Sequence, residues 1–268
     1  MNRLMKFGVV AAALAAFTAF AQEAAPVVAA DAPETVDVAE PEDVATAEPE
    51  EEPLSSCYED GVNGWSPILL GIATPVQLPI GTANWDIRGL AVSIAYTDLP
   101  KMYGVDVTFG VTMTREEMYG IEISGVGNWN RREAGGIRGT FFANVSNGAW
   151  YGLEFGSVSL HHEFYGFDAE LGASICEKGE GWQNAFVTNI AKDYMHGVQM
   201  AMGANIAPEF YGCQIAGIYN QTDYLRGAQI GLVNYARECP FGFQIGLINI
   251  ISDNMVPALP IFNCYFGD

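Results

Sequence analysis

The stretch Gly242-Phe243-Gln244-Ile245-Gly246-Leu247-Ile248-Asn249 repeats Gly227-Ala228-Gln229-Ile230-Gly231-Leu232-Val233-Asn234 with few changes. Looser copies begin at earlier glycines, and consecutive glycines are 14 to 16 residues apart. The earlier copies begin at Gly89, Gly104, Gly120, Gly136, Gly152, Gly166, Gly181, Gly197 and Gly212. A fixed period of this length indicates one structural unit that is used many times.

Each copy alternates between apolar and polar residues. In the last copy, Phe243 and Ile245 are apolar and flank the polar Gln244. Alternation with a period of two predicts a β-strand, as in Tyr211 to Asn220. Turn-like residues follow, and Asn147-Gly148 between two alternating runs favours a hairpin. Each copy therefore predicts a strand of about ten residues and a turn of about four.

A polar residue stands two places after most of the glycines, and neighbouring strands would align these residues in a row. The row consists of Glu122, Arg138, Glu154, Asp168, Gln183, Gln199, Gln214, Gln229 and Gln244. Its acidic members are concentrated at one end. The row predicts either the polar lining of a lumen or a set of side chains that satisfy one another or face water.

Aromatic residues lie at the ends of the apolar face of the predicted strands. They are Tyr119, Trp129, Tyr151, Tyr165, Tyr211, Tyr219 and Phe241. An apolar strand face must be hidden in a protein core or in lipid. In lipid, these residues would form an aromatic girdle at the membrane interface.

The first 54 residues differ in composition from the repeats. Residues 1–21 combine Arg3 and Lys6 with an apolar stretch and a small-residue cleavage pattern, which predicts a cleaved signal peptide. Residues 22–54 contain eleven acidic residues and no Lys or Arg, which predicts a disordered acidic linker. Residues 55–268 are predicted to be one repeat-built β domain.

The sequence lacks the patterns that most catalytic and metal sites require. His161-His162-Glu163 lacks the spacing of a zinc hydrolase helix and is predicted to be a turn. The five cysteines have no metal-ligand spacing, and no phosphate-binding glycine loop is present. The net charge of −20 repels nucleic acid. We therefore expect no enzymatic activity, no metal, no cofactor and no nucleic-acid partner.

The phrase Gly-x-Gln-Ile-Gly-Leu-x-Asn at 227–234 and 242–249 resembles the repeats of a bacterial family called surface repeat-containing proteins, of the leptospiral type. The lead-in Pro75-Val76-Gln77-Leu78-Pro79 and the tail Leu259-Pro260-Ile261-Phe262-Asn263 resemble the ends of that family's domain. The resemblance covers roughly residues 66–266. It implies exposure on a bacterial surface and assigns no activity or functional residue.

Two all-β architectures fit this pattern. The first is an antiparallel closed β-barrel of about 12–14 short strands, with the apolar face toward lipid and the polar row inside. It implies a Gram-negative outer-membrane protein, with membrane lipid as partner and either a structural or a passive-pore role.

The alternative is a parallel β-solenoid, with one coil per repeat, the apolar face inside and the polar row outside. Against it, the segments between the predicted strands look too short to form a second sheet. It implies a surface-displayed binding scaffold or adhesin for an unknown surface ligand. In both cases we expect a non-enzymatic protein that is exported to the outer membrane or the cell surface.

Overall fold

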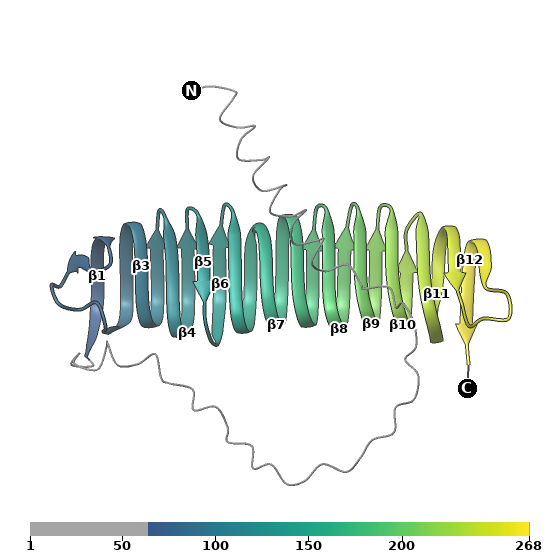
Figure 1. The fold of residues 1–268 in the computed structure, drawn as a ribbon, viewed down its shortest axis with the longest axis horizontal. Helices are drawn as coiled ribbons and strands as arrows, with labels where there is room; N and C mark the ends of the chain where they lie inside the picture. The colour runs from purple at the N-terminus through teal and green to yellow at the C-terminus, as the bar shows by residue number, and fades with distance from the viewer. Residues whose placement is uncertain (1–63, 268) are drawn as a thin grey trace, which may run out of the picture. The chain divides into compact units, whose positions relative to one another are not determined.

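The structure is a computed structural model that describes residues 64–267. These residues form a parallel β-solenoid, in which coils stack along one axis (Figure 1). The predicted signal peptide (1–21) and acidic linker (22–54) lie outside the described residues. Within the described range, no helix is long and apolar enough to cross a membrane.

Twelve strands make up one continuous sheet that winds around the axis. They are β1 (Trp65–Ala73), β2 (Val76–Leu78), β3 (Asp86–Thr108), β4 (Val111–Ser124), β5 (Gly127–Asn130), β6 (Ala134–Thr140), β7 (Ala143–Ala185), β8 (Thr188–Ala201), β9 (Ala204–Ala216), β10 (Tyr219–Ile230), β11 (Val233–Ile251) and β12 (Ala258–Phe266). The long strands contain gentle corners, so β7 follows the chain through more than one coil.

The predicted antiparallel barrel is wrong, because equivalent residues of successive repeats pair in parallel. Gly212 pairs with Gly227, and Gln214 pairs with Gln229. Antiparallel pairing is found only at the two ends of the described range, between β1 and β2 and between β11 and β12. A shift of one repeat brings each residue beside its own equivalent, which a hairpin cannot do.

The strand boundaries also differ from the prediction. The predicted strand Tyr211 to Asn220 bends at residues 217–218, between β9 and β10. The Asn147-Gly148 pair, predicted to form a hairpin, lies inside β7. Each repeat therefore supplies two short strand segments, and the second segment forms the second face of the coil.

The glycine that opens each repeat is required by the stacking of the coils. At Gly212, φ is +137°, and an added Cβ would lie 1.9 Å from the carbonyl oxygen of Gly197. A side chain at this position would meet both an unfavourable backbone conformation and a backbone atom of the preceding coil. This contact explains why the sequence period is marked by glycine.

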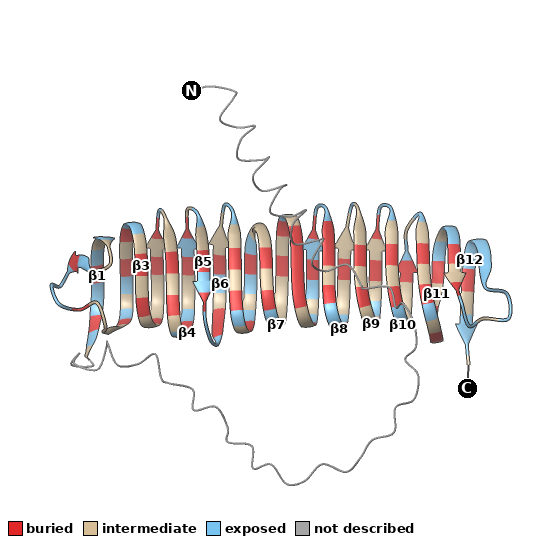
Figure 2. Cartoon of the chain, viewed as in Figure 1, coloured by how far each residue is buried: buried red, intermediate tan, exposed pale blue. Residues whose placement is uncertain are grey.

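The interior of the coils holds both polar and apolar side chains, and Figure 2 shows buried residues alternating with exposed ones along every coil. The polar row is fully buried, so the inward apolar face and outward polar row expected for a solenoid are wrong. A separate apolar cluster fills the interior beside the row, with Met118, Trp150, Phe164, Phe210 and Leu225 among its members. The apolar residues that flank the row point outward instead.

Candidate functional site

In the second half of the solenoid, the polar row is a ladder of glutamines. Gln199 donates from Nε2 to Oε1 of Gln183 at 2.8 Å, and Gln214 donates in the same way to Gln199 at 2.9 Å. Gln229 and Gln244 continue the ladder, with 2.7 Å for each hydrogen bond. Because an amide can donate and accept at once, the side chains of Gln199, Gln214 and Gln229 each bond to both neighbours in the buried interior.

A second ladder, of asparagines, runs through the opposite segment of the coils from Asn189 to Asn249. Asn205 donates from Nδ2 to Oδ1 of Asn220 at 3.0 Å, and Asn220 donates to Asn234 at 2.8 Å. The glutamines donate toward the N-terminal end of the stack, whereas the asparagines donate toward its C-terminal end. Together the two ladders give the buried polar groups partners in adjacent coils.

The row changes from neutral to charged residues in β4, β6 and β7. The guanidinium of Arg138 donates to Oε2 of Glu154 at 2.7 Å and to Oγ of Ser146 at 2.9 Å, and it lies 4.1 Å from the centroid of the Trp150 ring. All of these side chains are buried. Burial raises the pKa of Glu122, at the start of this charged section, to about 7.

Three buried carboxylates meet inside β7. One oxygen from each of Glu154, Asp168 and Glu170 lies within 4.8 Å of the others. Burial raises the pKa of Asp168 to about 7 and that of Glu170 to about 11. Gly156 makes room for this cluster, because a Cβ there would lie 2.8 Å from Oε2 of Glu170.

A buried histidine borders the three carboxylates. Nε2 of His161 lies 3.3 Å from Oε2 of Glu154, and neither ring nitrogen has a hydrogen-bond partner. Burial lowers the pKa of His161 to about 4, so the imidazole is neutral near pH 7. The neighbouring His162 is exposed and pairs with Glu177 at 2.6 Å. The predicted turn at this position is therefore part of β7, with one histidine inside and one outside.

The structure thus buries every residue of the predicted polar row and adds two that the sequence reasoning missed, His161 and Glu170. One signal could have identified Glu170. It stands four places after Gly166, where the equivalent residues of the neighbouring repeats are small, such as Gly156 and Ala185. His161 occupies the interior position that Ser146 holds one repeat earlier.

The two corners of each coil differ sharply in polarity. We call one corner the apolar ridge, and it comprises the residue pairs at which the chain bends on that side of the coil. In the described coils, these pairs carry no charged side chain. They are 109–110, 125–126, 141–142, 186–187, 202–203, 217–218 and 231–232. Phe109 is 71% exposed and Phe141 is 79% exposed.

The opposite corner, which we call the charged ridge, carries exposed residues of both signs. They are Glu116, Arg131, Arg132, Glu133, His162, Lys192, Asp193, Glu209, Asp223 and Arg237. Each coil therefore runs from a charged corner to an apolar one, and stacking extends both corners along the solenoid.

Five of the seven predicted girdle residues form one outer column, at the position just before each glycine. They are Tyr119, Tyr151, Tyr165, Tyr211 and Phe241. Tyr151 and Tyr165 lie in adjacent coils, and their rings stack with centroids 5.0 Å apart. Trp129 and Tyr219 lie instead on the other segment of the coil, beside the asparagine ladder. The column lies near the charged ridge.

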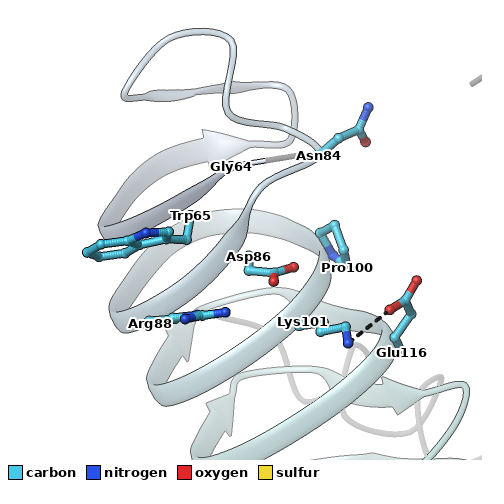
Figure 3. Close-up of a pocket in the computed structure, with 8 residues that line it drawn as sticks. All are labelled: Gly64, Trp65, Asn84, Asp86, Arg88, Pro100, Lys101 and Glu116. Atoms are coloured by element: carbon cyan, nitrogen blue, oxygen red, sulfur yellow. Dashed lines mark ion pairs between the residues drawn. The ribbon is translucent and has the colours of Figure 1, made fainter. Parts of the chain in front are cut away.

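A hollow of about 250 Å³ lies against the first coils (Figure 3). Trp65, Asp86, Arg88, Lys101 and Glu116 are among the residues that line it, and Nζ of Lys101 lies 3.5 Å from Oε2 of Glu116. The two cations are matched by two carboxylates, so the hollow has no excess of either charge.

No family model, curated protein or solved structure matches this chain. The resemblance to surface repeat-containing proteins therefore remains a prediction, and function has to be argued from the geometry alone.

Proposed function

We propose that this protein is an exported, non-enzymatic β-solenoid scaffold that attaches to a lipid surface along its apolar ridge. The observation that carries the proposal is the separation of the two ridges, with exposed Phe, Leu, Met and Ile side chains on one and charged side chains on the other. An apolar surface of this extent marks an interaction site. The signal-peptide pattern of residues 1–21 supports export.

The depth of the coil fits one leaflet of a bilayer. In each repeat, six residue steps along the strand segment that contains the opening glycine separate the aromatic column from the apolar ridge. At about 3.3 Å per residue, this distance is about 20 Å. Half of a bilayer, including its headgroups, is about 20–22 Å thick. With the ridge among the lipid tails, the tyrosines lie at the depth where aromatic residues gather in membrane proteins.

The interior fits such an attachment because lipid accepts a backbone only if its polar groups are satisfied. In the solenoid, strands pair with the coil before and the coil after, as β10 pairs with both β9 and β11. The buried amide side chains bond to one another as well. The charged ridge stays in water, where it is free to present a surface to other partners.

The test is flotation of the purified full chain with phosphatidylcholine vesicles, which are neutral and so do not repel a protein of charge −20. Phe109→Glu, Phe141→Glu and Phe186→Glu are combined in one variant. Burial of one Phe contributes roughly 1.5–3 kcal/mol, so we expect about 100-fold weaker binding or more.

A matched control combines Arg131→Gln, Arg132→Gln and Arg237→Gln on the charged ridge, which changes the net charge by the same amount. It should bind vesicles as the wild type does. The proposal is wrong if the wild type does not float with vesicles, or if the two variants bind equally. A lipid-independent dimer that the three Glu substitutions dissociate would assign the ridge to a second copy instead.

A further inference from the structure

The repeat is least regular at one place in the interior, and that place holds the buried acids. The glycines Gly152 and Gly166 are 14 residues apart, the shortest spacing in the series. The asparagine ladder is interrupted in the same coils, where Ser159 and Ser174 replace Asn, and the polar row carries Glu154 and Asp168 in place of Gln. These departures from the repeat coincide in the coils of Gly152 and Gly166, and departures from a local rule are typical of functional sites.

The charges at this site do not balance when all of its acids are ionised. The three carboxylates of Glu154, Asp168 and Glu170 then face one guanidinium, that of Arg138. The excess is two negative charges, which equals the charge of one divalent cation. Protons or a cation must supply the compensation, because uncompensated charge in a buried interior is strongly unfavourable.

Several atoms at this site are buried and have no hydrogen-bond partner. They are Oε1 of Glu154, Oδ1 of Asp168, both carboxylate oxygens of Glu170 and both ring nitrogens of His161. Buried polar atoms in native proteins are nearly always satisfied, so a group of them around one point indicates a missing partner. The histidine is an observation independent of the acids, because both of its ring nitrogens lack a partner and its Nε2 lies 3.3 Å from Oε2 of Glu154.

We propose that Glu154, Asp168 and Glu170, together with His161, hold one divalent metal ion inside the solenoid. The carboxylate oxygens are suitably spaced, and Nε2 of His161 lies beside one of them. Two ligands of a metal that bonds at about 2.1 Å lie about 3.0–4.2 Å apart, and a larger ion that bonds at about 2.4 Å extends this to about 4.8 Å. The distance from His161 to Glu154 is 3.3 Å, and the three carboxylate oxygens lie within 4.8 Å of one another. Mn²⁺ is the natural probe, since it accepts carboxylate oxygen and tolerates imidazole.

The ion acts as a structural brace in the middle of the stack. It joins the coil that begins at Gly152 to the coil that begins at Gly166, where the asparagine ladder is interrupted and the glutamine ladder has not yet begun. Because the site is enclosed, the ion enters as the chain folds, and its binding free energy adds to the stability of the folded state. This role is independent of the lipid attachment proposed above.

The first experiment measures the melting temperature of the full chain after refolding in chelator or in 1 mM Mn²⁺. We expect the metal to raise Tm of the wild type by about 5 °C or more. In the variant that combines Asp168→Asn and Glu170→Gln, the shape of the site is kept but its charge is lost. That variant should fold in chelator and show no shift with Mn²⁺.

The matched control is Asp106→Asn, which removes a buried carboxylate of the same interior column away from the cluster. It should keep the full shift with Mn²⁺. The absence of any shift in the wild type, or an equal shift in the Asp168→Asn, Glu170→Gln variant, would overturn the proposal and leave shared protons as the compensation for these acids.

A second readout tests the histidine. Electron spin echo spectroscopy of bound Mn²⁺ should show coupling to a ¹⁴N nucleus in the wild type, and the coupling should vanish in His161→Gln while the ion stays bound. Bound Mn²⁺ without nitrogen coupling in the wild type would overturn the assignment of His161 as a ligand.

Discussion

The two halves of the solenoid share one backbone fold, but their buried polar side chains are satisfied in different ways. From Gln183 to Gln244, the row is neutral, and the amides of Gln199, Gln214 and Gln229 each donate to the coil before and accept from the coil after. From Asp106 to Asp168, the same interior position is acidic except at Arg138. A carboxylate can only accept, so two stacked carboxylates repel each other unless a proton or a cation lies between them. A ladder can therefore be extended indefinitely with amides, but not with acids.

The largest expected effect tests whether both halves depend on the same close stacking. Gly152→Ala and Gly212→Ala each place a Cβ about 2 Å from a carbonyl oxygen at a positive φ. Each should cost about 4 kcal/mol of unfolding free energy or more, or prevent folding. Gly139→Ala is the control, because its Cβ would meet nothing within 4 Å, and it should change stability by about 1 kcal/mol at most. Urea denaturation followed by circular dichroism measures all three.

The next largest effect is expected from a substitution that disrupts the glutamine ladder of the neutral half and leaves the acidic half intact. Gln214→Leu keeps the volume of the side chain but leaves Oε1 of Gln199 without a partner and removes one of the two hydrogen bonds that Nε2 of Gln229 donates, the other being to the carbonyl oxygen of Tyr235. Each lost partner of a buried group costs about 1–3 kcal/mol, so unfolding free energy should fall by about 2–5 kcal/mol. Gln221→Leu, on the outer surface, should change it by less than about 1 kcal/mol. Equal effects of the two substitutions would mean that the ladder contributes no stability.

The acidic half should respond to pH, whereas the amides cannot titrate. Burial raises the pKa of Asp106 to about 6 and of Glu122 to about 7, so in the folded state both acids hold protons that the unfolded chain has released. This contribution to stability is fully present below about pH 4 and is lost as pH rises through 6 and 7.

In chelator, the unfolding free energy should therefore fall between pH 5 and 8, and Glu122→Gln should reduce that fall by about 2–3 kcal/mol. The control is Glu117→Gln, because hydrogen bonding from Tyr103 lowers the pKa of that exposed acid. Its titration lies below this pH range, so the control should keep the full fall. An unchanged pH dependence in Glu122→Gln contradicts the burial argument.

The smallest expected effect comes from loss of an ion pair on the surface of the solenoid. Nζ of Lys101 lies 3.2 Å from Oε1 of Glu117, and both side chains are partly exposed to water. Lys101→Gln should leave the unfolding free energy nearly unchanged, because exposed ion pairs are screened. A loss comparable to that of Gln214→Leu would contradict the distinction between interior and surface.

The sequence pattern predicted the strands, the period and the alignment of the polar row, but not how the strands pair. Alternation with a period of two is the same in a hairpin barrel and in a solenoid. The parallel pairing was expected only in the alternative solenoid, and the outward apolar face only in the barrel. The structure combines these two features.

The reason is that local alternation does not reveal where an amide finds its partner. Gln214 is buried because Gln199 and Gln229 lie one coil away on either side, and this relation exists only after folding. The bend at 217–218 was missed because it lacks a strong turn residue pair, whereas Asn147-Gly148 has one and continues a strand. The burial of His161 likewise depends on how the coil closes, which its neighbours in the sequence do not indicate.

The register of glycine on glycine and glutamine on glutamine has a consequence for the size of the molecule. Removal of residues 212–226 would join Tyr211 to Gly227 and place Gln229 against Gln199, with every donor still facing an acceptor. Insertion of another such segment would be equally well matched. The length of the solenoid can therefore change in whole steps of about 4.8 Å, the spacing between strands, without the design of a new core. The number of coils therefore sets the length of such a protein, and duplication of a 15-residue segment adds one coil.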